Sequence, residues 1–409
     1  MADRLAGKRL LVVEEALKDR IGHWYEYVKS VAELNAGQGV EVTVGAHCRI
    51  DPEIAAEIDA RPLFARTNWD GVYAHPQAWR RYLGIARHNW LVFRTMNRFV
   101  RQHGPFDCLF APTVVIHHIW GWRLLLFWQR RRIGRMVLLF RNNAGAYAPG
   151  SSTPVFKRSA MVFAWALRSF AVALREGRAA FATDSARLAR EYELLCGIAP
   201  KVFPSPRVAP FPALEDQAKP LDAPLVFSCL GPARFEKGID LLQEAIRLLL
   251  AGPPARPVQF VVQWNQPILN ADGSTYHPDP HLLADPRVTF LTGQLDSAGY
   301  DRAVAETDCM LLPYRRESYF ARISGVAVEA ATAGIAMIYT QDTWTSDFAE
   351  MSGAGIAIAD GDAAALAQAM RDMAENYAHF RALARERRKA AQQANSPEAF
   401  LAKLWGREL

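Results

Sequence analysis

The sequence predicts an α/β protein made of two Rossmann-like domains, each with a doubly wound parallel sheet. Three observations support this fold class. The length of 409 residues exceeds that of one ordinary domain. Short apolar runs without polar alternation, typical of strands buried on both faces, alternate with amphipathic helix patterns in both halves. A proline-rich stretch over residues 204–224 separates these halves.

The first half is expected to begin with a strand over residues 9–13. A loop containing Gly22 and His23 follows, and then an amphipathic helix over residues 24–36. Later apolar runs predict strands at residues 40–44, 108–111, 136–140 and 179–182, and a helix at 186–195. We assign residues 1–207 to an N-terminal Rossmann-like domain.

The second half repeats the pattern after a linker that we place at residues 208–224. Strands are expected at residues 225–230, 259–263, 288–291, 308–312 and 336–339, with helices at 239–250, 325–333, 363–376 and 378–391. The C-terminal domain is expected to span residues 225–390. Residues 391–409 should then supply a helix that closes back on the N-terminal domain.

Composition excludes several classes of protein. With 50% hydrophobic and 22% charged residues, the chain is neither disordered nor a coiled coil. Its five cysteines show no metal-binding spacing, which favours a reducing compartment and no disulfide framework. The beginning of the chain lacks a secretory apolar region, and the longest apolar stretch, 161–174, is too short to span a bilayer and contains Arg168. We expect a cytoplasmic protein.

Charge is distributed unevenly along the chain. Residues 1–210 contain 30 Lys and Arg against 17 Asp and Glu, whereas the remainder has 18 against 25. Residues 71–178 carry 17 basic and two acidic residues together with six tryptophans. An anionic membrane surface would explain both cations and tryptophans, whereas no nucleic-acid-binding module is visible. The alternative is a set of solvated arginines over an ordinary core.

The first motif spans residues 230–242, where an expected strand turns through Gly231 into a helix. Arg234 and Lys237 lie in the turn. Helix N-terminal amides and two cations favour a diphosphate. The alternative is an ordinary strand-to-helix turn with solvated cations.

The second motif spans residues 311–334. A loop rich in hydrogen-bond donors runs into a helix that is expected to begin near Ser324 and Gly325, whose free amides also suit an anion. Glu329, on the second turn, could accept hydrogen bonds from a ribose. Alternatively, Glu329 is a solvated helix residue.

Together the two motifs resemble the C-terminal half of a GT-B glycosyltransferase, most closely glycosyltransferase family 4 (glycosyl transferases group 1). The resemblance implies two domains that face a cleft, an N-terminal domain for the acceptor and a C-terminal domain for a nucleotide sugar. It implies that Arg234 and Lys237 are catalytic residues that hold the donor diphosphate. The donor-binding residues that it implies are Gly231, Arg322, Ser324, Gly325, Val326 and, for the ribose, Glu329.

The sequence departs from the family pattern at two positions. Pro232 follows the first glycine where a basic residue is usual, so we transfer that role to Arg234. Ala321 occupies the position of a glutamate that contacts the donor sugar, and Glu317 is near but out of register. Recognition of the donor sugar is therefore the least determined part of the resemblance.

Candidates for binding the acceptor or sugar come from the first half. Gly22 would let a ligand approach the backbone, and His23 could contact a sugar. His118 follows an expected strand and could orient an acceptor, and Arg141 ends another strand and could bind an anion. The alternatives are a helix-capping or exposed histidine at 23, a packed histidine at 118 and a structural loop at 141.

If the resemblance holds, the reaction is retaining, metal-independent transfer of a sugar from a nucleotide-diphosphate sugar to an acceptor hydroxyl, with no further cofactor. A lipid-linked or polysaccharide precursor is the candidate acceptor, which would place the protein at the inner membrane face. No nucleic acid is expected as a partner. Two alternatives stay open: a degenerate protein that binds without turnover, which Ala321 favours, and a nucleotide-sugar epimerase.

Overall fold

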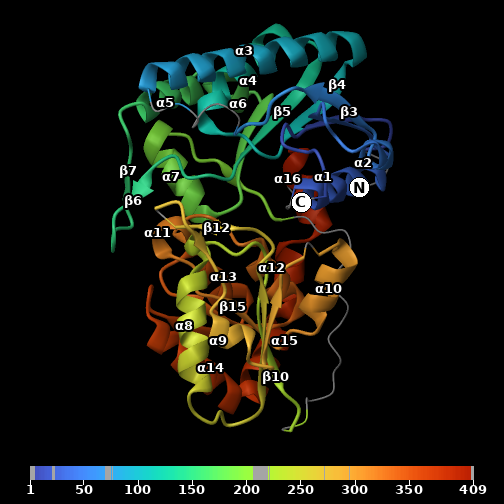
Figure 1. Ribbon diagram of the computed structural model, residues 1–409. Coiled ribbons are helices and arrows are strands. Elements are labelled where there is room, and N and C mark those ends of the chain that lie inside the picture. The colour runs from blue at the N-terminus through green and yellow to red at the C-terminus, as the bar shows by residue number, and fades with distance from the viewer. Residues whose placement is uncertain are drawn as a thin grey trace. The chain divides into compact units, whose positions relative to one another are not determined.

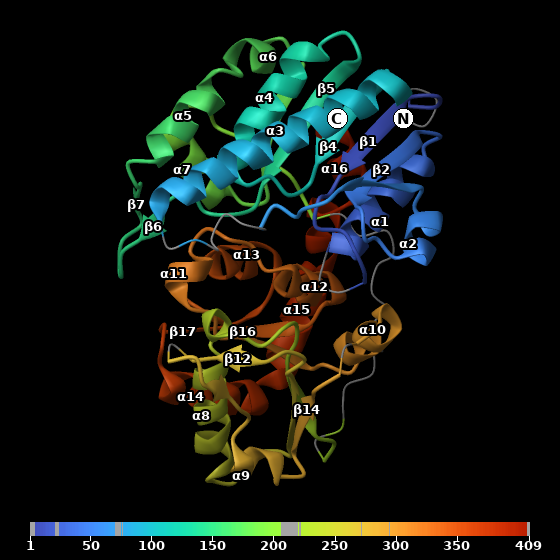
Figure 2. The same cartoon turned by 45° about the horizontal axis from the view of Figure 1, so that its top comes forward.

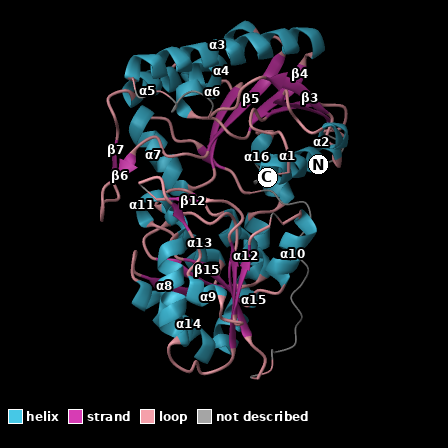
Figure 3. Cartoon of the chain, viewed as in Figure 1, coloured by secondary structure: helices cyan, strands magenta, loops and turns pink. Residues whose placement is uncertain are grey.

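The computed structural model describes residues 5–20, 24–69, 75, 77–205, 220, 222–270, 272–293 and 295–406. The chain divides into two compact units, residues 1–208 with 395–409 and residues 209–394 (Figure 1). Each unit is a parallel sheet with helices on both faces (Figure 3), which confirms the predicted fold class. The linker predicted at 208–224 falls almost entirely outside the described residues.

The first unit contains a seven-stranded sheet in the order β3-β2-β1-β4-β5-β8-β9. All neighbouring strands are parallel. The strands are β1 (Arg9–Val13), β2 (Glu41–His47), β3 (Ala60–Phe64), β4 (Phe106–Ala111), β5 (Ile133–Phe140), β8 (Ala179–Thr183) and β9 (Lys201–Val202). The order reverses between β1 and β4, and this is where open α/β sheets bind ligands, beyond the carboxyl ends of the strands.

Helices cover both faces of this sheet. They are α1 (Trp24–Ala36), α2 (Pro52–Glu57), α3 (Ala78–His103), the short η2 (Ile116–His118), α4 (Ile119–Trp128), α5 (Ala160–Arg168), α6 (Ala171–Arg175) and α7 (Ala186–Cys196). The small strands β6 (Ala146–Tyr147) and β7 (Pro154–Val155) form a hairpin. Helix α3 is the longest of the described helices and was not predicted from the sequence. Helix α3 packs against α4, and α4 packs against α5, so these helices form one layer (Figure 2).

The last helix, α16 (Pro397–Leu404), belongs to the first unit. The Ser396 side chain accepts a hydrogen bond from the Ala399 amide and caps the helix. Phe400 is fully buried and packs edge-on against Tyr27, while Trp405 Nε1 donates to Asn35 Oδ1 at 2.9 Å. The sequence analysis placed this return to the first unit at residue 391, whereas it begins at 395, because α15 (Tyr377–Ala394) continues in the second unit.

The second unit contains a six-stranded parallel sheet in the order β14-β11-β10-β15-β16-β17. Its strands are β10 (Leu225–Cys229), β11 (Val258–Gln263), β14 (Val288–Leu291), β15 (Cys309–Leu312), β16 (Ala336–Thr340) and β17 (Gly355–Ile358). The small strands β12 (Ile268–Leu269) and β13 (Thr275–Tyr276) form a hairpin. The order again reverses at the first strand, between β10 and β15.

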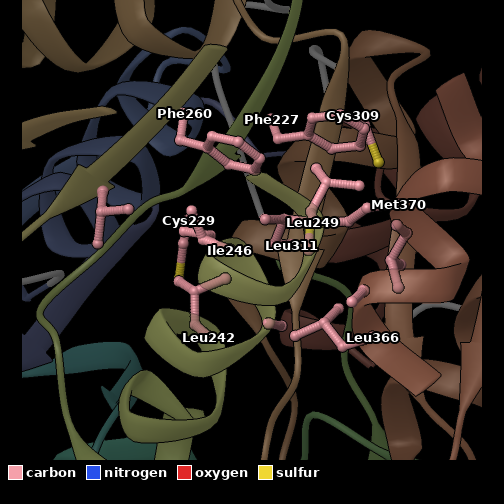
Figure 4. Packing of buried hydrophobic residues seen from close by; sticks show 14 of the residues in the cluster. Phe227, Cys229, Leu242, Ile246, Leu249, Phe260, Cys309, Leu311, Leu366 and Met370 are labelled. Atoms are coloured by element: carbon pink, nitrogen blue, oxygen red, sulfur yellow. The ribbon is translucent and has the colours of Figure 1, made fainter. Parts of the chain in front are cut away.

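The helical segments of the second unit are η3 (Phe235–Lys237), α8 (Ile239–Leu250), α9 (Pro280–Leu283), α10 (Ser297–Ala305), α11 (Arg316–Tyr319), α12 (Gly325–Ala333), α13 (Trp344–Ser352), α14 (Ala363–Glu375) and α15. On one face of the sheet, Phe227 and Phe260 stack with ring centroids 5.6 Å apart. Leu242 of α8 and Met370 of α14 belong to the same buried cluster (Figure 4). This packing fixes α8, and with it the loop between β10 and α8, to the sheet.

Candidate functional site

The loop after β10 contains two glycines that no other residue could replace without strain. Gly231 has φ +83°, and a Cβ there would lie 2.5 Å from Nζ of Lys237. Gly238 has φ +69°, and its Cβ would overlap the carbonyl oxygen of Pro313 at the end of β15. The first glycine therefore lets the lysine amine approach the backbone, and the second lets the loop pack against the neighbouring strand.

Lys237 is half-buried beneath this loop. Its Nζ donates to the Leu230 carbonyl oxygen at 3.5 Å and lies 5.6 Å from the centroid of the Tyr314 ring. Desolvation lowers the pKa of Lys237 to about 8, and the charge of Arg234 contributes in the same direction. The amine is thus a cation that lacks a full set of partners, and an anion bound beside it would restore its usual pKa.

Arg234 and Arg322 share a single carboxylate. Arg234 Nη1 lies 3.3 Å from Oε1 of Glu236, and Arg322 Nη1 lies 3.2 Å from Oε2. Burial of Glu236 would raise its pKa, but the charges and hydrogen bonds of Arg322 and Arg234 outweigh burial and lower the pKa. The Arg322 guanidinium also lies 5.0 Å from the Tyr319 ring centroid. With Lys237, three cationic side chains therefore surround one acidic group.

The N-terminus of α12 lies beside this loop. A Cβ at Gly231 would be 3.6 Å from Cγ2 of Val326, so the first turn of α12 adjoins the loop after β10. Ser324 caps the helix by accepting from the Ala327 amide at 3.2 Å, and Gly325 is exposed. The first amides of a helix have no partner within the helix and favour an anion.

Glu329 occupies the second turn of α12 and is half-buried. The Tyr300 hydroxyl of α10 donates to its Oε2 at 2.5 Å. The charge of Glu329 also affects the pKa of Lys237, which places the two side chains within electrostatic reach of each other. Tyr300 was not among the predicted site residues, because no local pattern connects it to a glutamate 29 positions away.

The structure therefore brings the predicted residues of the second half together, where β10 and β15 lie side by side. Ala321, at the position expected to hold a sugar-binding glutamate, is fully buried, and Glu317 is exposed. Two further buried contacts support the loop: the Gly231 amide donates to Gln263 Oε1 at 2.6 Å, and Ser324 Oγ donates to the Tyr314 hydroxyl at 3.4 Å.

In the first unit, His118 lies at the end of η2 and is buried. Its ring stacks on that of His88 with centroids 3.9 Å apart and meets the His117 ring edge-on at 4.4 Å. Burial lowers the pKa of His118 well below its usual value and that of His117 to about 4, so both rings are neutral at pH 7. Neutral imidazoles suit hydroxyl groups better than anions.

Two acidic residues directly follow β1. Glu15 Oε2 lies 2.7 Å from Nε2 of His88, and both side chains are buried. Burial raises the pKa of Glu14 to about 7. The position of this pair beyond a strand end was a signal that the sequence analysis did not use, and His88 lay in the helix that it missed.

Arg141 directly follows β5, at the strand end where it was predicted. Its Nε lies 3.7 Å from Oδ2 of Asp184, and its guanidinium lies 4.0 Å from the Tyr27 ring centroid. Gly22 and His23 lie outside the described residues. Within the part of the chain that the structure describes, no three His, Cys, Asp or Glu side chains converge as metal ligands would.

Comparison with known proteins gives one family match and several similar structures. Residues 224–376 match the model for glycosyl transferases group 1. Among solved structures, HepE of Anabaena in complex with UDP has a TM-score of 0.63 at 14% identity and covers 97% of this chain and 98% of its own. Sucrose-phosphate synthase from Thermosynechococcus elongatus has a TM-score of 0.61 at 16% identity, with 97% of each chain covered. A glycosyltransferase from Rickettsia africae has a TM-score of 0.59 at 14% identity, with 97% and 96% covered.

Two parallel-sheet α/β domains, matched over nearly their full length by these solved structures, show that the chain has the GT-B fold. The region that matches the model for glycosyl transferases group 1 contains the cationic loop and the α12 N-terminus. Curated proteins give no significant match to the sequence.

Proposed function

We propose that this glycosyltransferase moves a sugar from a nucleotide-diphosphate sugar to an acceptor hydroxyl with retention of configuration, as a member of family 4. One observation carries the proposal. Arg234 and Arg322 both contact Glu236, and Lys237 lies against Gly231, whose backbone adjoins the first turn of α12. Three cations and free helix amides around a glycine loop form a site for a diphosphate. HepE, which shares the fold, was solved with UDP and with UDP-glucose.

The proposed reaction breaks the bond between the anomeric carbon and the diphosphate oxygen and forms a bond to the acceptor oxygen. The acceptor proton passes to the departing diphosphate. Lys237 and Arg234 stabilise the negative charge that develops on this leaving group, together with the amides of Gly325 and Val326. Because these groups supply positive charge at the diphosphate, we propose that transfer needs neither a metal nor a cofactor. Glu329 holds the ribose in this arrangement.

The acceptor in this proposal is a lipid-linked or polysaccharide precursor. It binds in the first unit, where Arg141 contacts an anionic group. His118 is 1% exposed, which favours a packed histidine over one that contacts the acceptor. The enzyme would then work on the cytoplasmic side, at the inner membrane face. Within the described residues, no helix has the length and apolar content to cross a bilayer.

A second candidate function is nucleotide-sugar binding without turnover. It is favoured by Ala321, whose buried methyl group cannot replace the carboxylate that contacts the donor sugar. The two candidates differ in whether nucleoside diphosphate is released.

The test uses the full chain with UDP-, GDP-, ADP- and TDP-sugars, and records thermal stabilisation and release of nucleoside diphosphate. Transfer predicts that one donor stabilises the protein and is consumed in the presence of a lipid extract. Lys237→Ala should abolish release, whereas Lys389→Ala, an exposed lysine on α15, should not. Stabilisation without release under all conditions would replace the transferase with the binding protein, and stabilisation by no donor would exclude both.

A further inference from the structure

The exposed apolar side chains of this protein are concentrated in one layer of helices. Of the eighteen large apolar side chains that are exposed among the described residues, twelve lie on α3, α4, α5 or α6. Trp128 and Trp165 are 65% and 64% exposed, and Trp79 is 59% exposed. Tryptophans are normally well buried, so several exposed ones on adjoining helices indicate a binding surface.

On α3 these residues occupy a single face. Trp79, Leu83 and Trp90 are spaced by four and seven positions, which places them on one side of a helix. Val92 and Met96, on the other side of the helix, are buried. One side of α3 is apolar and buried. A second, aromatic stripe faces solvent.

The stripe continues across the neighbouring helices. Helix α3 packs on α4 and α4 on α5 (Figure 2), and Trp165 of α5 lies beside Trp120 of α4 with ring centroids 5.0 Å apart. Phe127 and Trp128 end α4 on its exposed side. We call the exposed residues Trp79, Leu83, Trp90, Phe127, Trp128 and Trp165 the aromatic face.

Cations surround the aromatic face. Arg87, Arg94 and Arg98 are exposed on α3, and Arg130 and Arg131 are exposed just after α4. Between residues 78 and 175 the sequence contains one acidic residue, Asp107, and its carboxylate is paired with Lys8 at 2.9 Å. The layer therefore presents strong positive charge with almost no compensating negative charge.

We propose that the aromatic face docks on a lipid bilayer that contains anionic phospholipid. Tryptophan and leucine enter the boundary between headgroups and acyl chains, while arginines remain at the headgroup phosphates. A second copy of the chain is a poorer occupant, because a two-fold contact would set the same arginines against one another. The inference rests on the proposed function, since a lipid-linked acceptor would lie in the membrane to which this surface binds. Vesicle binding tests it without any measurement of sugar transfer.

The test measures co-sedimentation of the full chain with vesicles of phosphatidylcholine alone and with 30% phosphatidylglycerol. Binding is expected only to the anionic vesicles and should be lost in 0.5 M salt. Each arginine near an anionic surface contributes about fivefold to the partition coefficient. Arg94→Ser with Arg98→Ser and Arg130→Ser should therefore weaken binding about a hundredfold. Trp90→Ser with Trp128→Ser and Trp165→Ser should weaken it by more than about tenfold.

The matched control removes equally exposed apolar residues from the second unit. Leu269, Leu283 and Met351 are 61%, 56% and 72% exposed, and changing all three to serine should leave vesicle binding unaltered. Thermal melting of each variant checks that it folds. Equal loss in the control, or no binding to anionic vesicles by the parent chain, would overturn the proposal. So would sedimentation velocity showing that the tryptophan variant dissociates a dimer while vesicle binding is unchanged. None of these results depends on the transferase reaction, which nucleoside diphosphate release tests separately.

Discussion

If a nucleoside diphosphate binds as proposed, Lys237 should make its affinity depend on pH in a range where an ordinary lysine would not titrate. Desolvation lowers its pKa from 10.5 to about 8 in the free protein. A diphosphate held by the amine would raise this pKa again, so binding takes up a proton above pH 8 and weakens as pH rises. About nine-tenths of the amine is protonated at pH 7 and about one-tenth at pH 9, so the Kd should rise about tenfold between them.

The assay is calorimetric titration with the nucleoside diphosphate that stabilises the protein, in buffers of different ionisation enthalpy at pH 7, 8 and 9. The ligand is almost fully ionised throughout, because its terminal phosphate titrates near pH 6. Burial raises the pKa of the adjacent Cys229 to about 11, beyond this range. Lys237→Arg should keep affinity and lose the pH dependence, because guanidinium stays charged. A flat profile in the parent protein, or the same slope in Lys237→Arg, would refute the reasoning.

Three further changes test single contacts. Gly238→Ala should lower the free energy of unfolding by more than about 2 kcal/mol in urea titration, because φ is +69° and the new Cβ would meet the Pro313 carbonyl; an unchanged midpoint would contradict this. Tyr300→Phe removes the hydrogen bond to Glu329 and should raise the donor KM about fivefold with kcat little changed, and the loss should be smaller for a 2′-deoxyribose donor. Phe400→Ala should cost about 3–5 kcal/mol of stability because it empties a fully buried position, and a cost below about 1 kcal/mol would show that α16 is not docked.

Most strands could be predicted from the sequence, whereas one long helix could not. The runs predicted at 308–312 and 336–339 correspond to β15 and β16, because strands buried on both faces are apolar at nearly every position. Helix α3 was not predicted because its solvent-facing side is also apolar. The exposed residues on that side include Trp79, Leu83 and Trp90. Apolar residues on both faces blur the period of 3.6 by which amphipathic helices are recognised.

The candidate site, too, could be predicted from the sequence only in part. The glycine loop and the start of α12 could be predicted because their residue types are local signals for backbone geometry and capping. The partners of those residues could not. Glu236 pairs with Arg322, which is 86 positions away, and Glu15 pairs with His88, which is 73 positions away. Only the fold determines which distant side chains meet. Local patterns in a single sequence do not show these contacts.

Ala321 is the main departure of this site from the glycosyltransferase pattern that it resembles. The residue is fully buried between α11 and α12, so the backbone there turns its side chain inward. Ala321→Glu would not restore a sugar contact; it would place a carboxylate in the core and cost more than about 3 kcal/mol of stability. In Ala321→Glu, both donor turnover and the melting temperature should decrease. Glu317→Ala, at an exposed position nearby, should change neither quantity. Increased turnover in Ala321→Glu at unchanged stability would mean that the position faces the donor after all. The inward turn implies instead that other groups contact the donor sugar, and Arg322 is the nearest chemically suited side chain in the sequence.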